Sequence, residues 1–202
     1  MKHPLQIGVT GGIGAGKSIV CQIFQALGIP IYEADERAKW LTEHDPILKA
    51  DIVRVLGPNA YDATGHYNRS WVASQVFTSP ALLGQLNGVI HPRVMSDTDA
   101  WVNEHADKPY VVKEAALMRA AGDKNSLDKV IVVRAPIDIR IERIRKRDPH
   151  RSIEEIRNII NRQVSDDERV QIADYVVDND ESQLVLPQVI RLHDEFLRDS
   201  AN

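Results

Sequence analysis

A glycine-rich segment near the start of the chain has the residue types that hold a phosphate. Residues 11–18 read GGIGAGKS, a complete match to the pattern GxxxxGK[ST]. In such a loop the glycines let backbone N–H groups approach an anion, the lysine reaches the β- and γ-phosphates, and the hydroxyl can bind Mg²⁺. The pattern therefore predicts a polyphosphate site formed by Gly11, Gly12, Ile13, Gly14, Ala15, Gly16, Lys17 and Ser18.

The sequence on either side of this loop supplies the context that the pattern requires. Residues 5–10, LQIGVT, read as a short buried strand, and apolar residues recur at helical spacing from Ile19 to Leu27, where Gly28 can cap the helix. A helix that begins at the loop points its N-terminus at the phosphates. The simpler alternative is a glycine-rich turn with an exposed lysine, but an incidental match rarely has both the strand and the helix.

Two carboxylates follow later apolar runs and could serve phosphoryl transfer. Asp35, in IPIYEAD, could accept the proton of an attacking hydroxyl or help to position Mg²⁺, and the alternative is that it caps the helix that begins there. Glu114 ends the run YVVK and could hold Mg²⁺ through a water if its strand lies beside the loop strand, or it could pair with Lys113. The residues alone leave both choices open.

A basic segment, RIERIRKRDPHR, occupies residues 140–151. Arg143 and Arg147 are four residues apart and therefore share one face of a helix. Guanidinium groups can bind phosphate oxygens and stabilise the charge on a transferring phosphoryl group, especially if the segment closes over the nucleotide as a lid. A basic face that is merely solvated is the alternative, and the presence of the phosphate loop favours phosphate binding.

A histidine and four aromatic residues in the helical stretch could contact a second substrate or could be structural. His91, in VIHP, has no neighbouring histidine or cysteine to complete a metal site, so we interpret it as a structural residue or a substrate contact. Packing in the core, rather than stacking on a base, is the expected role of the aromatic residues Trp40, Trp71, Trp101 and Tyr67.

Composition narrows the class of protein. A chain of 202 residues is long enough for one well-buried core and a smaller additional segment. Its formal net charge of -4 gives no general reason to expect nucleic acid or an anionic membrane as partner. Cys21 is the only cysteine, so we expect a buried structural thiol and a reducing compartment. No apolar run approaches the roughly 18 residues of a membrane span. We expect a soluble, cytoplasmic protein, and its oligomeric state does not follow from the sequence.

Short apolar runs alternate with helical segments, which favours an α/β fold with a parallel sheet flanked by helices. The expected strands lie in LQIGVT, IPIYEAD, YVVKEAAL, KVIVVRAP and ADYVVDN. A helical stretch at about 35–106 is too long for an ordinary crossover, so we interpret it as an insertion over the carboxyl ends of the strands. Residues 1–202 would then form one unit, with a nucleotide-binding core at 1–34, 107–135 and 171–202 and a lid at about 136–170.

These motifs resemble, in this order, those of the dephospho-coenzyme A kinases, which use ATP to phosphorylate the ribose 3′-hydroxyl of dephospho-coenzyme A in the last step of coenzyme A synthesis. The resemblance covers nearly the whole chain: IGVTGGIGAGKS, FQALGIPIYEADERAK, GHYNRSWVASQVF, LNGVIHPRV, VVKEAAL, APIDIRIERIRKRD and RQVSDDERVQIADYVVDND. It implies a three-layer P-loop NTPase-type fold, with ATP and Mg²⁺ on the loop. Asp35 would be the general base, and Lys17 with Arg143 and Arg147 would stabilise charge. The insertion would hold dephospho-coenzyme A through Tyr67, Arg69 and His91.

The sequence departs from the family pattern at four positions. Arg119 and Ala120 stand where many members have an aromatic and an acidic residue, Glu114 replaces a usual aspartate, and Arg140 replaces a common glutamine. These differences affect details of the pocket more than the reaction class.

Three rival functions share part of this pattern. Another small-molecule kinase would have the same loop, acid and arginines, and only the acceptor-site residues distinguish it. A GTP-binding switch protein is disfavoured because the DxxG match at residues 62–65 lies in a turn-rich stretch and no NKxD motif occurs. A nucleic-acid-binding ATPase is disfavoured because the basic cluster is short and the overall charge is acidic.

Overall fold

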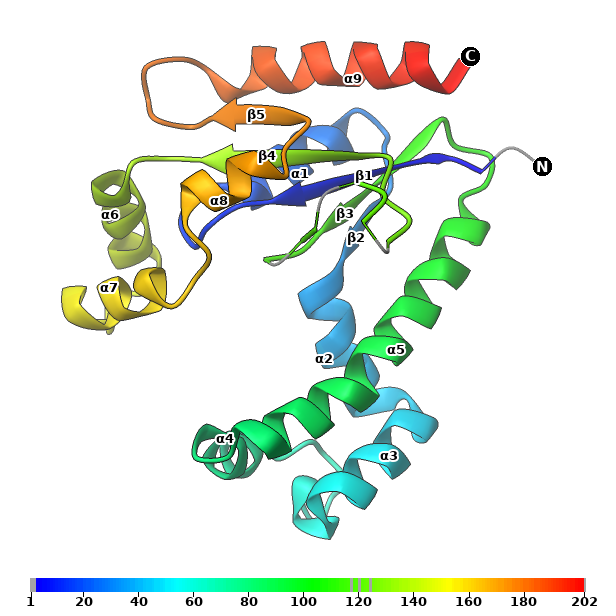
Figure 1. Ribbon diagram of the computed structural model, residues 1–202, viewed down its shortest axis with the longest axis vertical. Helices are drawn as coiled ribbons and strands as arrows, with labels where there is room; N and C mark the ends of the chain where they lie inside the picture. The colour runs from blue at the N-terminus through cyan, green and yellow to red at the C-terminus, as the bar shows by residue number, and fades with distance from the viewer. Residues whose placement is uncertain (1–2, 117, 120, 124, 202) are drawn as a thin grey trace. The chain divides into compact units, whose positions relative to one another are not determined.

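The computed structural model describes residues 3–201 with the exception of 117, 120 and 124. The chain divides into two compact units, one formed by Met1–Glu33 with Val102–Asn202 and the other by Ala34–Trp101 (Figure 1). The first unit contains the phosphate loop, and the second contains most of the helical stretch that interrupts the strands. Among the described helices, none combines the length and the apolar character that crossing a membrane requires.

A five-stranded sheet forms the centre of the first unit. The strands pair in parallel in the order β2-β3-β1-β4-β5. Their bounds are β1 Leu5–Thr10, β2 Ile31–Glu33, β3 Tyr110–Glu114, β4 Lys129–Arg134 and β5 Tyr175–Asp178. Each apolar run that was expected to form a strand supplies one of them, so the predicted parallel sheet is confirmed. In this order β1 lies between β3 and β4, which places the phosphate loop at the middle of the carboxyl edge of the sheet.

Helices cover both faces of this sheet. Those that pack on its strands are α1 Lys17–Ala26, α8 Asp166–Gln171 and α9 Val185–Ala201, while α6 Ile137–Arg147 and α7 Ile153–Asn161 pack on each other beyond the carboxyl end of β4 (Figure 1). On one face α1 and α9 contribute Phe24 and Phe196 to the main core around Ile7 and Val9. On the other face, residues of α8 lie beside Thr10. The predicted α/β fold of a helix-flanked sheet is therefore confirmed, and Gly28 ends the first helical segment with a φ of 84°.

A second, smaller core joins α6 to α7. It consists of four isoleucines, with Ile13 of the phosphate loop packed against them: Ile141, Ile144, Ile156 and Ile160. A capping box of Ser152 and Glu155 begins α7, and a second one, of Ser165 and Glu168, begins α8. The segment interpreted as a lid is thus built from short helices, of which α7 and α8 carry capping boxes and α6 has no side-chain cap, and its core includes a residue of the phosphate loop.

The second unit is helical. It contains α2 Ala34–His44, α3 Pro46–Leu56, the 3₁₀ turn η1 Pro58–Ala60, α4 Arg69–Phe77 and most of α5 Pro80–Glu104. Its core is formed by Leu41, Leu48, Ile52, Ala60, Val72 and Leu86. The Arg37 side chain joins α2 to α5 through two hydrogen bonds to Asp97, at 2.9 and 2.6 Å.

The aromatic residues of this unit differ in burial. Trp71 and Tyr67 pack against the core, as expected. The expectation is wrong for Trp40, which is 47% exposed and stacks on His44 with 4.7 Å between ring centroids. Arg37 covers the indole of Trp40 at 4.6 Å, a cation–π contact that a surface tryptophan can make without a core around it.

Candidate active site

The phosphate loop joins the carboxyl end of β1 to the start of α1. Gly16 precedes the helix with a φ of 101°, a left-handed conformation that glycine adopts readily. The N-terminus of α1 has no side-chain cap and no acidic residue in its first turn. Its first N–H groups and the positive end of the helix dipole therefore suit an anionic ligand.

Two residues from distant parts of the first unit pack directly on this loop. A Cβ atom added to Gly12 would lie 2.2 Å from Nη2 of Arg140, and one added to Gly16 would lie 2.1 Å from Nδ2 of Asn179. Asn179, which is buried just after β5, donates a hydrogen bond from Nδ2 to the carbonyl of Ala15 at 2.8 Å. A larger residue at either position would displace a side chain that supports the loop.

Lys17 and Glu114 meet beside the loop. The register of β1 and β3 places Val9 opposite Glu114, so the strand of Glu114 does neighbour the loop strand. Lys17 Nζ lies 3.5 Å from Oε1 of Glu114 and donates to the carbonyl of Gly11 at 3.1 Å. The neighbouring Lys113, the other possible partner of Glu114, donates to the side chains of Gln6 and Ser126.

Cys21 lies behind this pair in α1 and is buried, as expected. Burial, the largest cause, acts together with the nearby carboxylates of Glu114 and Glu33 and against the Lys17 ammonium to raise the pKa of its thiol to about 12. A thiol with this pKa stays protonated at neutral pH and is a poor nucleophile. Cys21 is therefore a structural residue of the core.

The two predicted arginines of α6 have different surroundings. Arg143 donates from Nη2 to Oδ1 of Asn179 at 3.2 Å, so it is joined to the phosphate loop through the residue that binds Ala15. Its Nη1 is buried and has no hydrogen-bond partner among the described residues. The side chain of Arg147 is 60% exposed, and it pairs with the adjacent Asp148 at 3.0 Å. The structure thus links Arg143, but not Arg147, to the loop.

Sequence reasoning missed the supporting roles of Asn179, of Arg140 and of Gln163, whose Oε1 accepts a hydrogen bond from the backbone N–H of Ile13 in the loop at 2.9 Å. Asn179 follows the last strand of the sheet, and its position at a strand end was the signal that could have identified it. The Nη2 of Arg140, like Nη1 of Arg143, is a buried donor without a partner in the described part of the chain. Two unpartnered guanidinium donors next to a glycine-rich loop are the chemistry expected of a site for a phosphate-bearing ligand.

The second unit carries Asp35, Tyr67, Arg69 and His91. Asp35 is exposed in the first turn of α2, one residue inside the helix rather than at its cap, and a negative charge there suits the helix N-terminus. The backbone N–H of Tyr67 donates to Glu43 at 3.0 Å, and Arg69 is the first residue of α4. His91 is exposed on α5, immediately before Pro92.

The departures from the family pattern lie near β3 and in α6. The Arg119 side chain is 63% exposed and lies 3.8 Å from Asp123. Ala120 lies outside the described residues. The match at residues 62–65 forms a tight turn, in which Asp62 accepts hydrogen bonds from the backbone of Thr64 and His66, and it does not follow a strand of the sheet.

Known proteins are similar to this chain in sequence and in fold over almost their whole length. The sequence profile described as dephospho-CoA kinase matches residues 5–184. A dephospho-CoA kinase of Porphyromonas gingivalis is 38% identical over 189 residues, which cover 93% of this chain and 92% of the relative. A dephospho-CoA kinase of Bacteroides fragilis is 32% identical over 188 residues, which cover 93% and 91%. The crystal structure of TT1252 from Thermus thermophilus has a TM-score of 0.80 at 28% identity and covers 98% of both chains.

Proposed function

Because the chain belongs to the dephospho-CoA kinase family, we propose that it transfers the γ-phosphate of ATP to the ribose 3′-hydroxyl of dephospho-coenzyme A, giving coenzyme A and ADP. The observation that carries the proposal is the family match over residues 5–184, in a chain whose phosphate loop joins a central strand to a helix N-terminus. A cytoplasmic location is part of the same proposal, since a single buried cysteine suits a reducing compartment.

The nucleotide phosphates would lie on Gly11 to Ser18. Lys17 now shares its ammonium between Glu114 and the Gly11 carbonyl, and it would turn to the β- and γ-phosphates when these are bound. Arg143 has one buried donor without a partner among the described residues, and that donor would stabilise the charge of the transferring group. Arg147 would join it only if the α6–α7 segment closes over the nucleotide, as the lid interpretation of residues 136–170 requires.

The metal would be Mg²⁺, held by the Ser18 hydroxyl and, through water, by Glu114. Mg²⁺ is commonly bound by one or two protein oxygens together with substrate phosphates, and the described residues contain no group of three or more His, Cys, Asp or Glu that could hold a metal by themselves. When bound, the ion supplies positive charge to the phosphate oxygens. Lys17 and Glu114 are paired with each other at 3.5 Å, and when the ion binds, Glu114 would turn to it while Lys17 turns to the phosphates.

The acceptor would be held by the second unit through Tyr67, Arg69 and His91. Asp35, exposed in the first turn of α2, would accept the proton of the 3′-hydroxyl as that oxygen attacks the phosphorus. The assignments of Asp35, Arg69 and His91 are separable by mutation, because these exposed side chains lie outside the core of the second unit, whereas Tyr67 packs against that core.

The experiment that tests the function is ADP release with ATP and Mg²⁺ against a panel of acceptors: dephospho-coenzyme A, adenosine, AMP, shikimate and none. We expect rapid turnover with dephospho-coenzyme A alone. Turnover with a different acceptor would leave the phosphate site in place and refute the assignment of the acceptor.

A further inference from the structure

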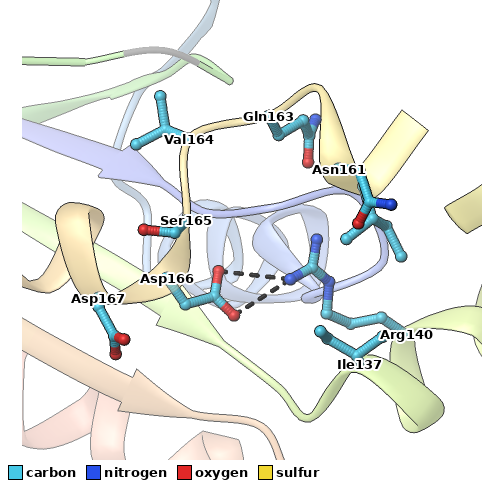
Figure 2. Close-up of a pocket in the computed structure, with 9 residues that line it drawn as sticks. Ile137, Arg140, Asn161, Gln163, Val164, Ser165, Asp166 and Asp167 are labelled. Carbon is cyan, nitrogen blue, oxygen red and sulfur yellow. Dashed lines mark hydrogen bonds and ion pairs between the residues drawn. The ribbon is translucent and has the colours of Figure 1, made fainter. Parts of the chain in front are cut away.

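A buried group of charges lies against the phosphate loop, on the side of α6 and α8. Arg140 and Arg169 are only 2% and 3% exposed, and both donate to the carboxylate of Asp166. Arg140 Nη1 lies 3.3 and 3.1 Å from the two oxygens of Asp166 (Figure 2). Two buried guanidinium groups therefore share one carboxylate, and an Nη2 atom of each has no hydrogen-bond partner among the described residues.

Ile13 is held from both sides by this region. Its backbone N–H donates to Oε1 of Gln163 at 2.9 Å, and its carbonyl accepts from Nε of Arg140 at 2.8 Å. Its side chain packs against the isoleucine core of α6 and α7. Gly12, the preceding residue, lies directly under the Arg140 guanidinium. Residues 12 and 13 of the loop are thus fixed by Arg140 of α6 and by Gln163, which follows α7.

The fixation has a physical consequence because the loop is rich in glycine. Glycine loses more conformational freedom than any other residue when it is ordered, so an unsupported loop with four glycines would sample many conformations before a nucleotide binds. Side chains that order the loop in advance remove that cost from binding. Asp166 in turn fixes the rotamer of Arg140, since the guanidinium fork makes its loop contact with Nε and its carboxylate contact with Nη1.

We propose that Arg140, fixed by Asp166 and assisted by Gln163, is a positioning residue that holds Gly12 and Ile13 in the conformation that binds the nucleotide phosphates. The proposal deepens the proposed function, because it concerns the nucleotide half of the same site. Because Ile13 is bonded to both Arg140 and Gln163, the chain at both of these positions is anchored to the loop.

The direct test replaces Arg140 with methionine, which keeps a long apolar stem and removes the fork. The variant should fold, because Asp166 keeps its pair with Arg169 at 3.2 Å and the cavity of about 390 Å³ beside residue 140 gives the new side chain room. We expect a fluorescent ADP analogue, N-methylanthraniloyl-ADP, to bind Arg140→Met about 10- to 100-fold more weakly than wild type. The KM for ATP should rise with it, while the KM for dephospho-coenzyme A stays within about twofold of wild type.

Two further variants make the test specific. Arg145→Met is the same substitution at an exposed position of α6 and should bind the analogue like wild type. Gln163→Met removes the other bond to Ile13 without touching the buried charges and should weaken binding in the same direction, and it carries the test alone if Arg140→Met does not fold. The proposal would be overturned if Arg140→Met and Gln163→Met both bound the analogue within twofold of wild type. It would also be overturned if these variants lost affinity equally for both substrates and had a lowered melting temperature. Binding of the ADP analogue needs no acceptor, so this result stands apart from the identity of the second substrate.

Discussion

Replacing Gly16 with alanine is expected to lower the free energy of unfolding by about 2–5 kcal/mol. The φ of 101° costs an L-residue roughly 1–2 kcal/mol in the left-handed region. The new Cβ would also lie 2.1 Å from Nδ2 of Asn179, so that side chain must move and give up its 2.8 Å hydrogen bond to the Ala15 carbonyl. Leaving a buried carbonyl without its partner costs about 1–3 kcal/mol.

Gly28→Ala is the matched control for this prediction. Gly28 also has a left-handed φ, 84°, but a Cβ there would meet no atom within 4 Å. Urea unfolding of both variants should therefore show about 1–2 kcal/mol of destabilisation for Gly28→Ala and more for Gly16→Ala. The difference measures the contact with Asn179. Equal destabilisation of the two variants would refute the role assigned to Asn179. A nucleotide titration should show weaker binding only for Gly16→Ala, because Asn179 also holds Arg143.

Three further predictions concern the chemistry of the site. Lys17→Ala should abolish turnover and weaken nucleotide binding, measured by ADP release and by titration with an ADP analogue, and an active variant would remove Lys17 from the mechanism. Asp35→Asn should bind ATP normally and lose about 10²- to 10⁴-fold in kcat, the usual range for a general base, and a near-normal kcat would exclude Asp35 from that role. Because burial raises the pKa of the Cys21 thiol from 9.0 to about 12, the folded protein holds this proton more tightly than the unfolded chain does. The stability that this bound proton contributes is fully present below pH 9. As the pH rises from 9 toward 12, the free energy of unfolding falls by up to about 1.4 kcal/mol per pH unit. Urea unfolding between pH 8.5 and 10.5 should show this loss in wild type and a shallower one in Cys21→Ala, and identical slopes would contradict the assignment.

The sheet and the phosphate loop were predictable because their signals are local. Each strand is a short apolar run, and the loop pattern specifies its own strand and helix. The order of the strands was only partly accessible. The metal hypothesis for Glu114 required β3 to lie beside β1. The sequence alone could not show whether it does, and the structure shows that it does.

The support of the loop could not be predicted in the same way, since it depends on contacts between distant residues. Arg140 lies 127 positions from the carbonyl that it binds, and in the sequence it looks like one member of a basic run. A faint signal existed, because Arg140 shares a helix face with Ile137 and Ile144 and so occupies a position that usually faces the core. Trp40 shows the opposite error, an aromatic residue that was expected inside and lies on the surface.

The most direct test of the central claim is the ³¹P NMR spectrum of the product formed from ATP, Mg²⁺ and dephospho-coenzyme A. The account predicts a new 3′-phosphomonoester resonance, identical to that of authentic coenzyme A, that grows in equal amount with ADP. It also predicts that Lys17→Ala forms neither product. ADP without a new phosphomonoester, or a phosphate attached at another position, would contradict the assignment of this protein as a kinase of dephospho-coenzyme A.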